Sequence, residues 1–174
     1  MRLLDANILM YASFDVFPQH ARTRKWLDAR LNDNDTPLGI PWESITAFVR
    51  LSSNPRIMSP AISVADAWTQ VRSWLAQPCV WTPVATARHR HYLDSFFNIP
   101  EMNYKLVADA QLAALAMEHG LVMVSADSDF RLFPGLRIEN PTIVLEKEPM
   151  EHENRRADAL KNPTFHPRPI SLGF

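Results

Sequence analysis

Three aspartates in the second half of the chain stand at the ends of predicted elements, where carboxylates can gather. Asp109 lies at the head of a predicted helix, and Asp127 and Asp129 follow a short apolar strand. The helix and the strand run in opposite directions, so they deliver these carboxylates to neighbouring ends. Carboxylate oxygens are the ligands that hard divalent cations prefer. This arrangement therefore indicates a metal site.

The segment from residue 107 to residue 133 must position these side chains. Its apolar residues recur at the three-and-four spacing of one helix face, and Asp109 heads the same stripe. The carboxylate of Asp109 is therefore expected to lean toward the core side of the helix. Gly120 ends the helix, and residues 121–124 form an apolar run that is typical of an internal parallel strand.

Two further acids lie earlier in the chain. Asp5 follows a predicted strand at residues 2–4, at the edge where open α/β sheets bind ligands. Taken alone, Asp5 and Asn7 are better explained as turn or helix-cap residues, because their side chains satisfy free backbone amides there. Glu43 stands in the first turn of another predicted helix, where an acid interacts favourably with the helix N-terminus by roughly 0.3–1 kcal/mol. By itself, that structural explanation is also the better one for Glu43.

Strand-like segments alternate with helical segments along the chain. The predicted strands are residues 2–4, 38–40, 80–84, 121–124 and 143–145. Such alternation predicts an α/β fold with three layers, α/β/α, in which helices cover both faces of a central parallel sheet of about four to five strands. We expect residues 1–147 to form one domain. Residues 148–174, rich in proline and charge, are expected to form a C-terminal tail with little fold of its own.

The composition excludes several other classes of site. The chain has 4 glycines, and their positions allow neither a GxGxxG motif nor a Walker A loop. The single cysteine, Cys79, excludes an internal disulfide and a cysteine-based metal site. No apolar run approaches the roughly 20 residues of a membrane span, and no signal peptide is evident, so the cytoplasm is the expected compartment. A net charge of −1 argues against a large non-specific polyanion binder but not against a nuclease, whose clustered acids offset basic residues elsewhere.

Four phrases of the sequence carry a family resemblance. VADAQLAALAMEHG and SADSDFRLFPGLR closely resemble the third and fourth motifs of PIN-domain ribonucleases, in particular the VapC toxins of bacterial toxin–antitoxin pairs. LDANILMYA resembles the opening motif of the PIN family, and WESITAFVRLSSNPRI resembles the phrase that holds the second acid. The resemblance spans residues 1–141. Its departures are minor: an alanine and a glutamine flank Asp109 where related toxins often carry proline and histidine.

The resemblance implies a role for each acid. It assigns one or two Mg²⁺ or Mn²⁺ ions to a set of four carboxylates, which would position a water for in-line attack on a phosphodiester. The four are Asp5, Glu43, Asp109 and Asp127. A divalent cation also relieves the repulsion that free carboxylates feel in a dry pocket. Asp129 is expected nearby, or instead in an Asx-turn, and Asn7 and Ser125 are candidates to orient the carboxylates or the water.

The resemblance further implies an endoribonuclease that cuts structured RNA such as tRNA or rRNA. Family members usually form homodimers, and a small VapB-like antitoxin silences them. Basic side chains are weaker candidates for RNA contact: Arg50, Arg88, Arg90 and Lys105. Arg50 fits a surface ion pair at least as well, and the ARHRH cluster at residues 87–91 fits a solvated helix face equally well.

Two other functions remain open at this stage. A phosphatase with Asp5 as a covalent nucleophile also keeps an aspartate after the first strand. Such an enzyme would need a second acid two residues on, where this chain has Asn7. The second alternative is a catalytically weak PIN-like module that binds RNA or protein, and the complete set of acids argues against it.

Overall fold

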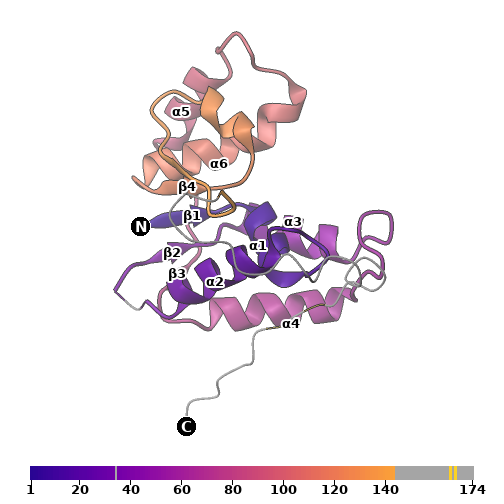
Figure 1. The fold of residues 1–174 in the computed structure, drawn as a ribbon. Helices are drawn as coiled ribbons and strands as arrows, with labels where there is room; N and C mark the ends of the chain where they lie inside the picture. The colour runs from indigo at the N-terminus through magenta and orange to yellow at the C-terminus, as the bar shows by residue number, and fades with distance from the viewer. Residues whose placement is uncertain (34, 144–164, 166, 168–174) are drawn as a thin grey trace.

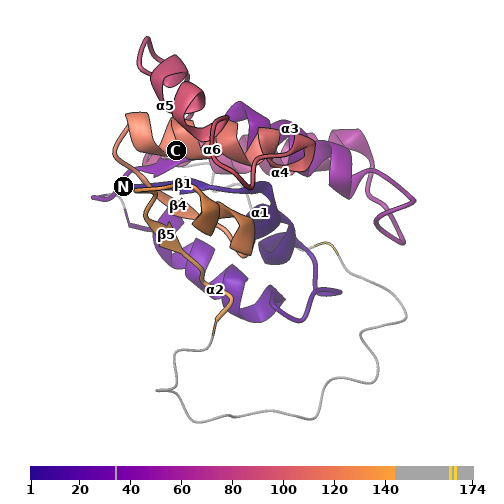
Figure 2. The same cartoon turned by 90° about the horizontal axis from the view of Figure 1, so that it is seen from above.

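Five parallel strands form the central sheet of the computed structural model, which describes residues 1–33, 35–143, 165 and 167. The strands are β1 (Arg2–Leu4), β2 (Leu38–Gly39), β3 (Val80–Trp81), β4 (Val122–Val124) and β5 (Ile138–Glu139). Their order in the sheet is β3-β2-β1-β4-β5, so β1 lies in the centre and pairs with both β2 and β4. Figure 2 shows β1, β4 and β5 side by side in this order. The predicted parallel sheet is confirmed.

Helices cover both faces of this sheet (Figure 1). One face carries α1 (Ala6–Ser13), α2 (His20–Leu31), α3 (Trp42–Ser52) and α4 (Val64–Leu75). The other carries α5 (His89–Phe96) and α6 (Val107–Glu118), with the short 3-10 helices η1 (Tyr104–Leu106) and η2 (Ser128–Leu132). Alternate residues of β1 serve the two layers: Leu4 belongs to the core under α1–α4, and Leu3 to the core under α5 and α6. The three-layer α/β/α fold is therefore confirmed.

The connection from α6 to β4 follows the predicted helix stop. Gly120 has a φ of 66°, a left-handed conformation that residues with a Cβ rarely adopt. The amide of Leu121 then donates to the carbonyl of Ala116 at 2.8 Å, which closes the end of the helix. The chain therefore reverses at once into β4, and the N-terminal end of α6 lies over the same sheet edge as the carboxyl end of β4.

The second and fourth strands are each one residue shorter than predicted, and two others differ by more. β3 stops at Trp81 rather than at residue 84, because Pro83 has no amide proton for the ladder. The last strand is β5 at Ile138–Glu139, earlier than the predicted 143–145. Ile143 lies in no strand, and residues 144 and 145 lie outside the described residues. The early position of β5 follows from the tight turn at Gly135, which brings the chain directly back to β4.

Most of the predicted C-terminal tail, residues 148–174, lies outside the described residues. Phe165 is described, and it forms an antiparallel bridge with Phe14 at the end of α1. The two rings pack with their centroids 5.2 Å apart, so Phe165 adds to the core under α1–α4. Within the described part of the chain, no helix has both the length and the apolar character needed to cross a bilayer.

Candidate active site

The carboxyl end of β1 holds Asp5 in a small polar cluster. The Oδ2 atom of Asp5 accepts hydrogen bonds from Asn7 Nδ2 at 2.6 Å and from the Ser125 hydroxyl at 2.7 Å. Asn7 Nδ2 also donates to Ser125 Oγ at 2.9 Å. Asp5 occupies the N-cap position of α1, but its side chain makes no capping hydrogen bond. The backbone amides of Ala6 and Asn7 still help to lower the pKa of Asp5, as a turn residue would experience, and the orienting contacts expected of Asn7 and Ser125 are also present.

The loop after β4 brings a second carboxylate to this cluster. The amide of Asp127 donates to Ser125 Oγ at 3.0 Å, so one serine hydroxyl joins Asp5 to the loop. Oδ1 of Asp127 accepts from the amide of Asp129 at 2.9 Å and caps η2. In the Asx-turn predicted at Asp129, the accepting side chain is therefore that of Asp127, and Asp129 supplies the donating amide. Both aspartates are exposed.

Asp109, in the first turn of α6, is the third carboxylate that lies near Asp5 and Asp127. It is half-buried, as its place on the helix stripe predicted. Burial raises the pKa of Asp109 to about 6, and the negative charges of Asp127, Asp5 and Asp129 add to the increase. Burial likewise raises the pKa of Asp5, which the Ser125 hydroxyl lowers in part and the charge of Asp127 raises further. Four aspartates from three elements are therefore close enough to repel one another.

Glu43 reaches this region by another route. It is exposed in the first turn of α3, and its Oε1 accepts a hydrogen bond from Gln111 Nε2 at 2.8 Å. This bond ties the start of α3 to the surface of α6, two residues beyond Asp109. Glu43 is not among the charges that raise the pKa of Asp109. The structure thus brings Asp5, Asp109 and Asp127 together with Asp129, and it places Glu43 beside them through Gln111.

The chemistry of these side chains fits a hard divalent cation. Their donors are oxygens only, and within the described residues none of the four aspartates forms an ion pair with a lysine or an arginine. No group of three His, Cys, Asp or Glu side chains in the described part of the chain is close enough as it stands to hold one ion. The cluster is therefore a convergence of unneutralised acids, and it is not a closed ligand shell.

The predicted RNA-contact residues divide into two groups. Arg50 on α3 and Lys105 in η1 are exposed, and neither forms an ion pair with a described residue. Arg88 instead donates to the Tyr92 hydroxyl at 2.8 Å and its guanidinium lies over the Tyr92 ring. Arg90 pairs with Asp94 at 3.5 Å. In the first group, Arg50 shares α3 with Glu43, and Lys105 lies in η1, which leads directly into the first turn of α6 and Asp109.

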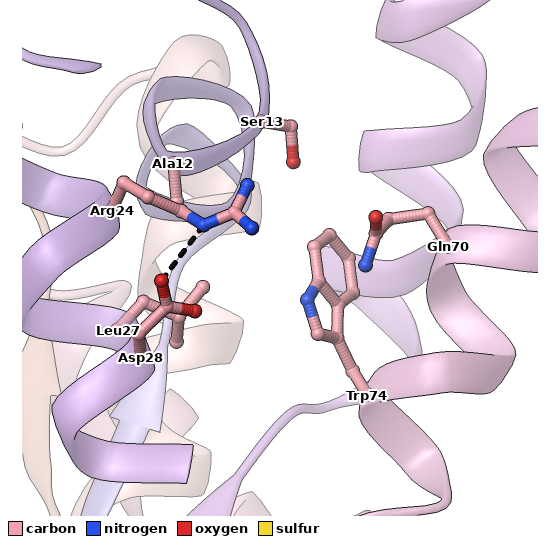
Figure 3. A pocket seen from close by; sticks show the side chains of 7 residues that line it. All are labelled: Ala12, Ser13, Arg24, Leu27, Asp28, Gln70 and Trp74. Carbon is pink, nitrogen blue, oxygen red and sulfur yellow. Dashed lines mark hydrogen bonds and ion pairs between the residues drawn. The ribbon is translucent and has the colours of Figure 1, made fainter. Parts of the chain in front are cut away.

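A separate hollow lies between α1, α2 and α4 (Figure 3). It is lined by Ala12, Ser13, Arg24, Leu27, Asp28, Gln70 and Trp74. On the α2 side of this hollow, Arg24 Nε donates to Asp28 Oδ2 at 2.9 Å, so these two charged groups neutralise each other. None of the converging aspartates lines this hollow, and the chemistry of the chain lies elsewhere.

Gln111 is the contact residue that the sequence did not reveal. Its exposed position on the polar side of α6 is ordinary for a helix surface. Its partner, Glu43, is 68 residues away in the chain, so no local pattern links the two. Only the packing of α3 near α6 makes the pair.

Known proteins resemble this chain in sequence and in fold. Ribonuclease VapC37 of Mycobacterium tuberculosis is 37% identical over 145 residues, which are 83% of this chain and 100% of the relative. Ribonuclease VapC33 of the same species is 32% identical over 141 residues, 81% of this chain and 98% of the relative. No protein-family model matches the chain.

Solved structures support the same fold. The VapBC2 complex of Rickettsia felis, bound to a promoter DNA fragment, contains a chain that aligns with a TM-score of 0.58 at 14% identity, over 80% of this chain and 97% of that one. The DNA-bound VapBC complex of Salmonella typhimurium gives 0.55 at 14% identity, over 81% and 99%. The sequence relatives share more than 30% identity over nearly their whole length. The chain therefore belongs to the VapC family of ribonucleases.

Proposed function

We propose that this protein is a Mg²⁺- or Mn²⁺-dependent endoribonuclease that acts as the toxin of a toxin–antitoxin pair. The observation that carries the metal dependence is the state of Asp109. Its carboxyl has a pKa raised to about 6 because it is partly buried beside Asp127, Asp5 and Asp129. A divalent cation would neutralise this repulsion and keep all the carboxylates ionised near neutral pH.

Each side chain has a distinct part in this proposal. Asp5, Asp109 and Asp127, with Glu43, would hold the ion. Asn7 and Ser125 donate to Oδ2 of Asp5 and so fix the orientation of this carboxylate. When bound, Mg²⁺ or Mn²⁺ supplies the positive charge that activates water and stabilises the scissile phosphate. The carboxylates then accept the proton that the attacking water loses.

The partners follow from family membership. Relatives are named ribonucleases, and the neighbouring structures are complexes of VapC-like chains with VapB or FitA proteins. We infer that this chain cuts structured RNA such as tRNA or rRNA, forms a homodimer, and is silenced by a VapB-like antitoxin. A phosphatase that uses Asp5 as its nucleophile is disfavoured, because Asn7 occupies the place of its second acid and is bonded to Asp5.

Calorimetric titration with Mn²⁺ tests the metal assignment independently of activity. Asp5→Asn and Asp109→Asn should each weaken Mn²⁺ binding by at least about tenfold. Asp94→Asn is the matched control, since this exposed acid on α5 already pairs with Arg90 and should leave binding unchanged. Unchanged Mn²⁺ affinity in both site variants would remove the assignment.

Cleavage of total tRNA and rRNA, followed by sequencing of the new ends, tests the reaction itself. The wild-type chain should cut RNA with Mn²⁺ and stop when EDTA is added. The same two site variants should lose more than about 100-fold in rate, and Asp94→Asn should not. RNA that binds the wild type but stays intact would instead support a module that has lost activity.

A further inference from the structure

Phe165, in the C-terminal tail, contacts the folded domain at the end of α1. Phe14, the C-cap residue of α1, has extended backbone angles, φ −128° and ψ 125°, and forms an antiparallel bridge with Phe165. The tail residue is therefore held against the domain as a strand residue would be. The resemblance to VapC toxins spans residues 1–141, so it assigns no role to this contact.

The Phe165 ring is the outermost of four aromatic rings that lead into the core. Its centroid lies 5.2 Å from that of Phe14, and the Phe14 centroid lies 6.4 Å from that of Phe48. The Phe48 ring meets the Trp74 ring edge-on at 4.9 Å. The three inner rings are buried and come from the end of α1, from α3 and from α4. Phe165 is only partly buried, and it covers the outer side of this core.

The contact of the tail with Phe14 is short. Both main-chain groups of Phe14 are already bonded inside the domain, the amide to a carbonyl in the last turn of α1 and the carbonyl to an amide three residues on. Pro163 and Pro167 stand two residues to either side of Phe165, and neither has an amide proton to donate to a longer ladder. One bridged pair and one ring therefore make up the contact, and the ring supplies its selectivity.

The occupant that the structure supports is the tail of the same chain, because Phe165 is seated there. Residues 144–164 join Ile143 to Phe165, and at about 3.3 Å per residue such a span can reach up to about 70 Å. A segment tethered in this way competes at an effective concentration in the millimolar range. A second copy at micromolar concentration cannot match that, so the site is filled from within the chain.

We propose that the surface around Phe14 is a docking site for an extended segment with one aromatic side chain, and that the tail of this chain fills it reversibly through Phe165. The occupant is recognised by an extended backbone and a single ring. The proposal is independent of the nuclease function, because Phe14 and Asp5 lie at opposite ends of α1, a helix of 8 residues and about 12 Å.

Binding of a peptide to the full-length protein tests the proposal. The peptide comprises residues 160–170 with a fluorescein label, and its fluorescence anisotropy reports binding. It should bind the Phe165→Ala protein at least about tenfold more tightly than the wild type, whose own tail competes for the site. A peptide that carries alanine in place of Phe165 should bind neither protein.

The stability of the full-length variants gives a second readout. Phe165→Ala should lower the urea midpoint, and an excess of the unlabelled peptide should raise it again, because a ligand of the folded state stabilises that state. Phe165→Leu, which keeps an apolar side chain, should lose less. Ile143→Ala is the matched control: it removes an apolar side chain that is 52% exposed, and it should leave peptide binding as in the wild type.

Three results would overturn the docking site. The first is a Phe165→Ala protein that does not bind the peptide at about 1 mM, the range of a tethered segment. The second is equal affinity of the peptide for wild type and Phe165→Ala, which would place the peptide elsewhere on the surface. The third is a Phe165→Ala protein that elutes as a smaller species than the wild type, which would show that Phe165 fills the site of a second copy.

Discussion

The two ends of α6 carry acids in opposite electrostatic situations. Asp109 in the first turn has a pKa raised to about 6, because it is partly buried among other carboxylates. Glu118 in the last turn is fully buried in its side chain, and burial alone would raise its pKa. Hydrogen bonds from Thr86 and His89, and the charge of His89, outweigh burial, so the pKa of Glu118 lies below its ordinary value.

The difference teaches how to tell a structural acid from a functional one. The Thr86 amide donates to Glu118 Oε2 at 2.9 Å, and His89 Nδ1 lies 2.7 Å from Oε1, so the chain itself satisfies this carboxylate. It joins the start of α5 to the end of α6. Asp109 has no such partner among the described residues, and its neighbours add to its charge. Its compensation must come from outside the chain, as a proton or a cation.

Removing Glu118 should produce the largest effect on stability. Glu118→Ala leaves His89 and the Thr86 hydroxyl and amide facing a buried void, and loss of one partner of a buried pair costs about 3 kcal/mol. Urea unfolding in EDTA would measure it. Glu118→Gln, which keeps the Thr86 contacts and loses the charge, should cost less.

Asp109→Asn is the matched change at the other end of the helix, and it should not destabilise the metal-free protein at pH 7. An equal loss of stability in Asp109→Asn and Glu118→Ala would contradict the distinction between the two ends.

The contributions of Asp109 and Glu118 to the free energy of unfolding should change with pH in opposite directions. The folded state raises the pKa of Asp109 from 3.8 to about 6, so it binds this proton more tightly than the unfolded chain. The resulting stabilisation is complete below about pH 4 and is lost as the pH rises through 6. Relative to wild type, metal-free Asp109→Asn should therefore gain stability between pH 4 and pH 7.

Glu118 should behave in the opposite way, because its folded pKa is lowered. Its contribution is present above pH 4.5 and is lost as the pH falls. Urea midpoints of wild type, Asp109→Asn and Glu118→Gln at pH 3, pH 4.5 and pH 7.5, in EDTA, would measure the two trends. A pH-independent difference between Asp109→Asn and wild type would refute the raised pKa.

The same contrast explains how far the sequence could predict the molecule. Asp109 and Asp127 were predictable because strand ends and helix stripes follow local periodicity, whereas Asp5 and Glu43 were assigned to the site by the family resemblance. The role of Glu118 was not predictable from a local pattern, because its partners Thr86 and His89 lie about 30 residues earlier, just before α5 and in its first turn. β5 was misplaced because a strand of two residues has no period to read.

The contact that no local pattern could reveal, Gln111 with Glu43, should give the smallest effect. Both side chains are exposed, so Gln111→Ala should change stability by less than about 0.5 kcal/mol. If Gln111 holds Glu43 beside the acids, its loss should lower the Mn²⁺-dependent cleavage rate by about tenfold, as for other residues that orient a metal-binding carboxylate. The decisive measurement is a double-mutant cycle with Glu43→Gln. Gln111→Ala should have no further effect in that background, because its role acts only through the Glu43 carboxylate, whereas fully additive losses would show that Gln111 acts on the RNA directly.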